Sequence, residues 1–437
     1  MSFILRNEFF GGLLYDVAGK NYYHLDHATV AVLRSANVLC REEYSDSPSI
    51  NEAEQAALRN ELSTLGALGN TTFLNNTPGE GLLSAPLRVF YDITYRCSEA
   101  CKHCFTDSGR GETDELNLEE KTGLIDQLVD MACFRVSIAG GEPLLDQHFF
   151  PFVDYALRRG IDVSFSTNAA AVTDSVAERL ARTNIRTINV SLDGWDEQSF
   201  AIVRGHGRFP RVLQGIDRLR RKYSGRLAAK CTIMRTNVGH LERIIALAAE
   251  HGFDAIKFNG VRLAGRARTQ EWLFPTQDEY LQALSSLADL HDTGHAPINL
   301  ELPANPYQTC EEGGAGSIDE LGPGCYAAKE SLCVTPCGDI TPCSSFGRGR
   351  FTDGNVRVTP ILEAWRCGSS MSLFRAKKNN PECLACSALA ACRGGCHQRA
   401  FYMYGTLDDV DPYCFKRKNR PWDGWQSTPD GGQHGAL

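Results

Sequence analysis

The sequence has no apolar run that approaches the length of a transmembrane helix, and it has no long block of basic residues. A membrane-spanning helix needs about 20 apolar residues in succession, and basic clusters mark proteins that bind nucleic acid or anionic membranes. This chain of 437 residues carries a net charge of −8, and its first residues lack the layout of a signal peptide. We therefore expect a cytoplasmic protein whose main partner is neither nucleic acid nor a membrane.

Cysteine, in contrast, is abundant and unevenly placed. Of 17 cysteines, three lie within residues 97–104 and ten lie between Cys325 and Cys414. Cytosolic thiols stay reduced, so grouped cysteines indicate metal ligands rather than disulfides. Four cysteines stand alone, and we interpret the middle two as small buried residues: Cys40, Cys133, Cys231 and Cys310.

The first cysteine group follows a predicted strand over residues 87–94. Cys97, Cys101 and Cys104 have the spacing C-x3-C-x2-C, and Phe105 comes next. Thiolates are the ligands of iron–sulfur clusters, and such a cluster normally takes four of them. Three thiolates from one short loop would hold three irons of a cubane and leave the fourth iron open for reaction.

This pattern resembles the signature of the radical S-adenosylmethionine enzymes. The resemblance implies that Cys97, Cys101 and Cys104 are the catalytic ligands of a [4Fe–4S] cluster, with Phe105 packed near the cluster and the cofactor. The reduced cluster would pass an electron to S-adenosylmethionine, which would release a 5′-deoxyadenosyl radical that abstracts a hydrogen from the substrate. The electron itself would come from a partner such as flavodoxin or ferredoxin.

Strands and helices alternate through residues 87–300, which predicts a parallel sheet. Six βα units over this length fit an α/β fold, a partial (β/α)6 TIM-like barrel, with functional groups at the C-terminal ends of its strands. The predicted strands cover residues 87–94, 134–138, 161–165, 185–192, 228–234 and 255–258.

Polar motifs follow several of these strands, and the resemblance assigns them to the S-adenosylmethionine site. A Gly-Gly-Glu-Pro motif follows the second strand, and its counterpart in the family binds the methionine amino group. Ser191 and Arg204 are candidates for the methionine carboxylate, although residues 191–194 also suit a plain cap and turn, and Arg204 also suits the surface. The segment after the sixth strand would contact adenine, through Val261 or Leu263. The remaining cofactor contacts implied are Gly140, Gly141, Glu142, Ser166 and Asn168.

Residues 1–75 are predicted to form a separate winged-helix-like α+β domain. A hairpin is expected over residues 12–25, Asp26 caps a first helix, and a capping box at residues 49–52 opens a second. Residues 10–16, 22–26 and 31–33 resemble the leader-recognition element of peptide-modifying pathways, related to the peptide chaperone of pyrroloquinoline-quinone biosynthesis. The resemblance implies that this domain binds the leader of a ribosomal precursor peptide as an added strand. The alternative is a generic hairpin–helix domain for dimerisation or folding.

The C-terminal cysteines resemble the SPASM extension of peptide-modifying radical enzymes in all seven cysteine positions, and we assign this domain to residues 301–420. The resemblance implies two auxiliary [4Fe–4S] clusters, so three in all. Cys325, Cys343 and Cys396 would ligate the first, and Cys383, Cys386, Cys392 and Cys414 the second.

A fourth ligand for the first auxiliary cluster is left open. Cys333, Cys337 and Cys310 are available, and strand alternation across residues 333–337 would place Cys333 and Cys337 on one face. The site could instead stay open for substrate. The alternative for the whole set is a pair of zinc knuckles, since C-x2-C pairs also suit zinc.

Together these features predict a radical maturase that forms a carbon–carbon or thioether cross-link in a ribosomally made peptide. Two alternatives are a sulfatase-type maturase or other SPASM oxidoreductase, and an iron–sulfur electron carrier without turnover. No general acid or base is evident. Residues 76–86 are interpreted as a linker, and residues 421–437 as a tail.

Overall fold

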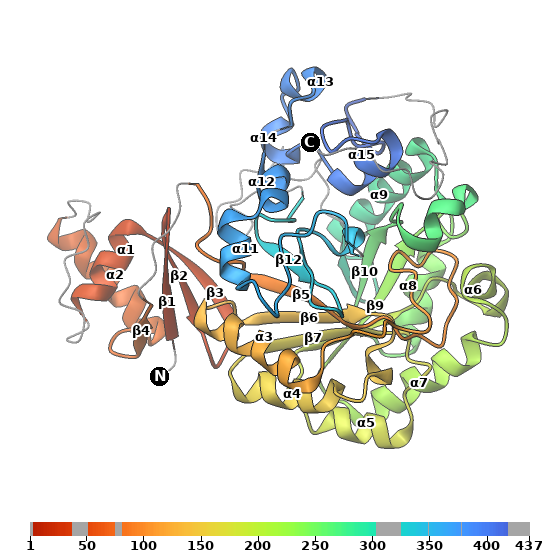
Figure 1. The fold of residues 1–437 in the computed structure, drawn as a ribbon, viewed down its shortest axis with the longest axis horizontal. Coiled ribbons are helices and arrows are strands. Elements are labelled where there is room, and N and C mark those ends of the chain that lie inside the picture. Colours follow the sequence, from red (N-terminus) through yellow and green to blue (C-terminus); the bar gives the residue numbers. More distant parts are fainter. Residues whose placement is uncertain are drawn as a thin grey trace.

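The computed structural model describes residues 3–36, 51–74, 81–302, 325–347, 349–376 and 378–417. An N-terminal module stands beside a large α/β body, and a cysteine-rich region covers one side of that body (Figure 1). Within the described residues, no helix is both long and apolar enough to cross a membrane. The expected tail, together with Cys40 and Cys310, lies outside the described residues.

The N-terminal module is a four-stranded sheet in the order β3-β2-β1-β4, with two helices packed on it. The predicted cap is present, because the side chain of Asp26 accepts a hydrogen bond from the backbone N–H of Thr29. The elements are β1 (Phe3–Glu8), β2 (Gly11–Asp16), β3 (Asn21–Asp26), α1 (His27–Ser35), α2 (Glu52–Leu65) and β4 (Thr71–Phe73).

Two features of the module differ from the prediction. The capping box of α2 is formed by Asn51 and Glu54, two residues later than predicted, because the backbone turns into the helix at Asn51. The strand β4, which pairs in parallel with β1, was not predicted because three residues are too few to show an alternating pattern.

The six predicted barrel strands are confirmed, and neighbouring strands pair in parallel throughout. They are β5 (Arg88–Thr94), β6 (Arg135–Gly140), β7 (Asp162–Thr167), β8 (Thr187–Ser191), β9 (Arg226–Ile233) and β10 (Ala255–Gly260). Their helices are α3 (Leu118–Asp130), α4 (Phe149–Arg158), α5 (Asp174–Ala181), α6 (Glu197–Arg204), α7 (Phe209–Lys222), α8 (Leu241–Glu250) and α9 (Gln277–Asp292).

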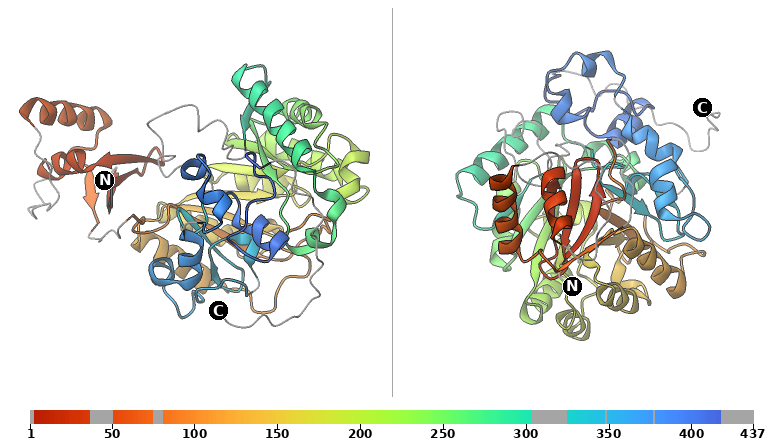
Figure 2. Two further views of the ribbon diagram at one scale, coloured as in Figure 1. Left: turned by 90° about the horizontal axis from the view of Figure 1, so that it is seen from above. Right: turned by 90° about the vertical axis from the view of Figure 1, so that its left-hand side faces the viewer.

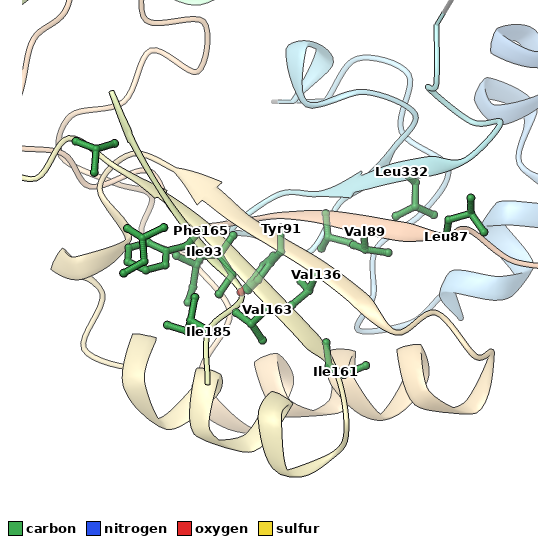
Figure 3. Packing of buried hydrophobic residues seen from close by; sticks show 14 of the residues in the cluster. Leu87, Val89, Tyr91, Ile93, Val136, Ile161, Val163, Phe165, Ile185 and Leu332 are labelled. Atoms are coloured by element: carbon green, nitrogen blue, oxygen red, sulfur yellow. The ribbon is translucent and has the colours of Figure 1, made fainter. Parts of the chain in front are cut away.

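Alternation along each strand explains why this sheet forms. On β5, Val89, Tyr91 and Ile93 are fully buried and pack toward the helices (Figure 3). Because side chains of a strand alternate between its two faces, Phe90, Asp92 and Thr94 lie on the opposite face, the barrel interior. A polar interior of this kind leaves side chains available for a reaction site at the strand ends.

The sheet extends beyond the six predicted strands. The strand β11 (Asn299–Glu301) pairs with β10, and the cysteine-rich region contributes β12 (Ser331–Val334), which pairs in parallel with β5. A short β13 (Ile340–Thr341) completes a nine-stranded sheet in the order β11-β10-β9-β8-β7-β6-β5-β12-β13. The cysteine-rich region is therefore continuous with the barrel sheet.

Short helices complete the cysteine-rich region, and 3-10 helices lie in several loops of the described chain. The α-helices are α11 (Ile361–Cys367), α12 (Ser369–Arg375), α13 (Pro381–Leu384), α14 (Leu389–Cys392) and α15 (His397–Tyr404). The 3-10 helices are η1 (Pro143–Leu145), η2 (Gly265–Thr269), η3 (Glu271–Leu273) and η5 (Ser344–Phe346).

The module packs against the N-terminal ends of the barrel strands (Figures 1 and 2). The backbone N–H of Phe134, just before β6, donates to the hydroxyl of Tyr22. The backbone carbonyl of Lys20 accepts from Arg135 and from Arg186, which lies just before β8. The module therefore lies at the end of the barrel opposite to the loop that carries the first three cysteines.

Residues 83–86, in the described part of the expected linker, are buried. The buried side chain of Arg6 donates to the carbonyls of Ala85 and Pro86. The indole of Trp365 in α11 donates to the carbonyl of Leu83, so this segment contacts both the N-terminal module and the cysteine-rich region. Its composition predicted a linker, and these tertiary contacts hold the described part of it in place.

Candidate functional site

The loop between β5 and α3 carries the first three cysteines, and each of their sulfur atoms faces an N–H donor. The backbone N–H of Glu99 lies 3.4 Å from Cys97 Sγ, and the backbone N–H of Ser108 lies 3.4 Å from Cys104 Sγ. The Arg204 guanidinium lies 3.7 Å from Cys101 Sγ. Such donors stabilise negative charge on sulfur, so this set of residues fits thiolate ligands of a cluster.

Burial disfavours the thiolate form of Cys97 and of Cys101 in the absence of a metal. It raises the pKa of Cys97 to about 11, with smaller contributions from its neighbours, and it also raises the pKa of Cys101. A metal must displace these protons to bind, since only the thiolate is a ligand.

Several residues that were not predicted hold this loop in shape. Arg266 in η2 donates to the carbonyls of Cys101 and Ser108 and pairs with Asp107. At the other end of the loop, the carboxylate of Glu115 accepts from Thr94 and from the backbone N–H of Tyr95. Nothing in the spacing of either residue distinguishes it from an ordinary surface charge, so sequence patterns had no means to select them.

The Gly-Gly-Glu-Pro motif ends β6 directly beside the cysteine loop. Gly140 has φ +110°, a backbone conformation that favours glycine. An added Cβ at Gly141 would overlap the carbonyl of Arg96, which itself accepts from the backbone N–H of Glu142. Glycine is thus required at residue 141, because the backbone there lies in direct contact with the backbone of Arg96.

We expect Gly141→Ala to lower the free energy of unfolding by about 1–3 kcal/mol, the usual cost of forcing extra atoms into a packed site. Gly239→Ala is the matched control, because an added Cβ there meets nothing within 4 Å. Chemical denaturation of both variants measures the difference. Equal stability of the two variants would contradict the close approach at Gly141.

Glu142 is fully buried and connects the ends of β6 and β7. Its carboxylate accepts from the backbone N–H of Asn168 at 2.8 Å, the hydroxyl of Thr167 at 2.8 Å and the backbone N–H of Leu144 at 3.2 Å. Burial raises its pKa to about 7 despite these hydrogen bonds. A cation beside this carboxylate would favour its ionised form.

The other predicted cofactor contacts lie around the same edge of the barrel. The side chain of Asn168 points its amide nitrogen toward Cys97 Sγ, at 3.9 Å. Ser166 and Ser191 lie on β7 and β8, half-buried. Val261 and Leu263 lie after β10, with both side chains buried in a separate apolar cluster, so only their backbone is available to a ligand. All of these cofactor roles remain predictions.

Arg204 has partners other than the carboxylate expected of it. Its guanidinium forms a buried ion pair with Asp193 at 2.6 Å. The same carboxylate lies 3.4 Å from the imidazole of His103 and accepts from the backbone N–H of Thr232. The Arg204 charge holds the pKa of Asp193 below its usual value although burial opposes it. The contacts of Asp193 link the cysteine loop to β8 and β9.

The cysteines assigned to the first auxiliary cluster lie near one another. Burial raises the pKa of Cys325 to about 12, and the thiols of Cys396 and Cys343 add to this effect. Cys333 on β12 is buried and has Cys343 among its electrostatic neighbours. The neighbours of Cys337 are instead acidic residues such as Glu112.

The predicted pairing of Cys333 and Cys337 on one strand face is wrong. The strand β12 ends at Val334, and a turn follows in which the backbone N–H of Gly338 donates to the carbonyl of Thr335. Cys337 lies in this turn. The chain reverses tightly into β13, so the residues after Val334 form a turn and do not continue the strand as alternation predicts. Of the two described cysteines considered as a fourth ligand, Cys333 is the one whose thiol is close enough to Cys343 for its pKa to be raised by it.

The four cysteines assigned to the second auxiliary cluster line a single cavity of about 270 Å³. Its walls also include Asp411 and Lys416. Among the described residues, no three His, Cys, Asp or Glu side chains are placed to hold one metal ion; a cubane instead distributes its thiolates over separate irons. The cysteines of the cavity are Cys383, Cys386, Cys392 and Cys414.

Comparisons with known families agree with this arrangement. Residues 91–248 match the Radical SAM superfamily, and residues 325–387 match SPASM, an iron–sulfur cluster-binding domain. Mycofactocin maturase MftC of Mycobacterium tuberculosis is 30% identical over 345 residues, which cover 78% of this chain and 85% of that protein.

Solved structures share the fold. SuiB of Streptococcus suis, solved with bound S-adenosylmethionine, has a TM-score of 0.71 at 18% identity and covers 94% of this chain and 97% of its own. The structure of anSMEcpe with bound AdoMet has a TM-score of 0.62 at 18% identity, covering 75% of this chain and 94% of its own. The wider coverage by SuiB includes most of the N-terminal module. The chain therefore belongs to the radical S-adenosylmethionine superfamily, in the SPASM-containing maturase family that includes the mycofactocin maturases.

Proposed function

We propose that this protein is a cytoplasmic radical maturase that introduces a carbon–carbon or thioether cross-link into a ribosomally made precursor peptide. The observation that carries the proposal is the juxtaposition of the three-cysteine loop with the Gly-Gly-Glu-Pro turn at the C-terminal edge of the barrel. The name of the mycofactocin maturases, and a SuiB structure bound to the precursor peptide SuiA, support a peptide as the substrate class.

The chain's own residues would bind and orient the cofactors. Cys97, Cys101 and Cys104 would hold a [4Fe–4S] cluster, and Glu142 would accept from the amino group of S-adenosylmethionine. When bound, the reduced cluster and S-adenosylmethionine together supply a 5′-deoxyadenosyl radical, with the electron delivered by flavodoxin or ferredoxin. Cys325, Cys333, Cys343 and Cys396 would hold one auxiliary cluster, and the four cysteines of the 270 Å³ cavity would hold another.

The N-terminal module would bind the leader of the precursor. The strand β3 is an edge of its sheet, and an extended peptide can pair with such an edge through backbone hydrogen bonds. The fold likeness to SuiB over 94% of this chain supports a shared module.

The position of the module predicts a minimum number of residues between the leader of the precursor and the residue that is modified. The module packs at the N-terminal ends of the barrel strands, whereas the cysteine loop follows the C-terminal end of β5. The seven residues of β5 span roughly 23 Å at about 3.3 Å per residue. An extended peptide advances about 3.3–3.6 Å per residue, and its path must run outside the packed barrel, so about ten residues are needed.

We expect a precursor whose leader and target residue are separated by fewer than about seven residues to bind but to remain unmodified. Synthetic precursors, based on a short open reading frame beside the gene, would be compared with spacers of graded length. Fluorescence anisotropy measures binding, and mass spectrometry detects the loss of two hydrogens on cross-linking. Modification of the short-spacer peptide at the full rate would refute the leader site on the module, whereas absence of any binding would refute the choice of peptide.

A further inference from the structure

One side chain spans the gap between the cysteine loop and the first auxiliary group of cysteines. Arg262 follows β10 and donates from Nη1 to the hydroxyl of Ser344 at 2.8 Å and to that of Ser345 at 3.2 Å. Its guanidinium carbon also lies 4.4 Å from the ring centroid of Phe105. Phe105 directly follows Cys104, and Ser344 directly follows Cys343, so one guanidinium joins the two loops.

The orientation of this side chain separates it from its neighbours in sequence. Val261 and Leu263 are both buried in an apolar cluster with Met234 and Phe274. The side chain of Arg262 instead is half-buried, donates to two hydroxyl groups and lies over the ring of Phe105. Two hydroxyl groups and an aromatic face restrict the position of the guanidinium. A mobile surface arginine would lack such restriction.

The charge of Arg262 acts on the thiols of the auxiliary group. Burial raises the pKa of Cys343 and of Cys333, and the Arg262 charge opposes the increase in both. Other charged groups also face this region: Asp92 on β5, whose pKa burial raises to about 7, and Lys230 on β9, whose pKa burial lowers to about 8. The guanidinium is the member of this set that cannot lose its charge.

We propose that Arg262 is a positioning residue that holds a fixed positive charge beside the first auxiliary cluster and thereby raises its reduction potential. The proposal rests on the assignment of Cys343 as a ligand of that cluster. Reduction adds one negative charge to a cluster, and its potential depends on nearby charge and hydrogen bonding. A cation held in a partly buried site stabilises the reduced state more than the oxidised state.

The test compares Arg262→Met with Arg262→Lys in the reconstituted full chain, without any peptide. A redox titration with dithionite, followed by electron paramagnetic resonance, determines the midpoint potential of each cluster. In Arg262→Met we expect the midpoint potential of one cluster to become more negative by about 59 mV. For a one-electron reduction, this shift lowers the ratio of reduced to oxidised cluster about tenfold at a fixed solution potential. Arg262→Lys keeps the charge and should shift less.

Arg179→Met is the control for net charge, because Arg179 pairs with Asp154 on the helical surface of the barrel. It should leave every midpoint unchanged. Unchanged midpoints in Arg262→Met as well would overturn the proposal. If Arg262→Met fails to assemble its clusters, the variant Ser344→Ala decides. It removes the shorter hydrogen bond that holds the guanidinium and keeps Ser345, whose side chain hydrogen-bonds Cys343. A shift to more negative potential supports the proposal, and no shift overturns it.

Failure of the wider functional proposal has a different signature. The redox titration is done without peptide, so its result does not depend on whether the proposed peptide is the true substrate. If Cys343→Ala retains the iron content of the unaltered chain, the ligand assignment is wrong, whatever role Arg262 has.

Discussion

Replacement of Cys97 by alanine should reduce reductive cleavage of S-adenosylmethionine by at least about 100-fold, since a cluster with one open iron needs its three thiolates. Cys97 lies on the loop at the C-terminal end of β5, with its Sγ beside the backbone N–H of Glu99 and the amide of Asn168. No other described cysteine lies in this loop besides Cys101 and Cys104. The lost ligand therefore has no substitute within the loop.

The measurement is the yield of 5′-deoxyadenosine from reconstituted, reduced protein without any peptide. Iron content should fall by about four of about twelve atoms per chain, because the two auxiliary clusters remain. Cys367→Ala is the matched control, because Cys367 is exposed and lies outside every proposed ligand set. Cleavage by Cys97→Ala at the rate of the control would show that the cluster assignment is wrong.

Replacement of Glu142 by glutamine should weaken S-adenosylmethionine binding by roughly 10- to 100-fold, corresponding to about 1.5–3 kcal/mol for a hydrogen bond to a charged group. The carboxylate of Glu142 is surrounded by donors from Asn168, Thr167 and Leu144. A glutamine would turn an NH₂ group toward one of these donors, so the variant should also be less stable. Equilibrium dialysis of S-adenosylmethionine and chemical denaturation measure the two effects separately.

The pH dependence gives Glu142 a specific signature. Burial raises its folded pKa to about 7 from an ordinary value of 4.5. In the unliganded chain, the contribution of this group to stability is present below pH 4.5 and is lost as the pH rises through about 7. The cationic amino group of S-adenosylmethionine favours the ionised carboxylate, so affinity should decrease as the pH falls below about 7. Glu142→Gln should remove this dependence.

Glu8 provides a matched control for a buried carboxylate. It is as buried as Glu142, and it accepts from Arg6 and from the backbone and side chain of Ser84. It lies at the module end of the barrel, so Glu8→Gln should lower stability without changing the affinity for S-adenosylmethionine. Equal loss of affinity in both variants would indicate a general loss of structure instead of a role for Glu142 in binding.

Local patterns predicted the parts of this protein whose signal lies in short stretches of chain. The six barrel strands are short apolar runs, and helical periods lie between several of them. Such runs are typical of strands in a parallel sheet that is covered on both faces, so they are visible without a structure. The three-cysteine loop and the glycine motif were equally visible, because ligand spacing within one loop is a property of the sequence.

Predictions were wrong where a neighbouring element determines the outcome. Alternation extended the strand at Cys333 as far as Cys337, but the pairing of β12 with β13 requires a turn there. Arg6 and Trp365 also bind carbonyl groups in the described part of the linker predicted over residues 76–86. Neither the turn nor these contacts could be predicted from local patterns, because the partners are distant in sequence.

The sequence by itself determined the family of this protein and the order of its barrel strands, and it supplied the candidate residues for binding iron and S-adenosylmethionine. Only the tertiary structure decided that β12 of the cysteine-rich region joins the barrel sheet beside β5, that the module lies at the opposite end from the cysteine loop, and that Arg262 joins two loops that are more than two hundred residues apart in the chain. The physical reason is that spacing and alternation are recorded within a few successive residues, whereas packing, charge and hydrogen bonding act between whichever residues the fold brings together.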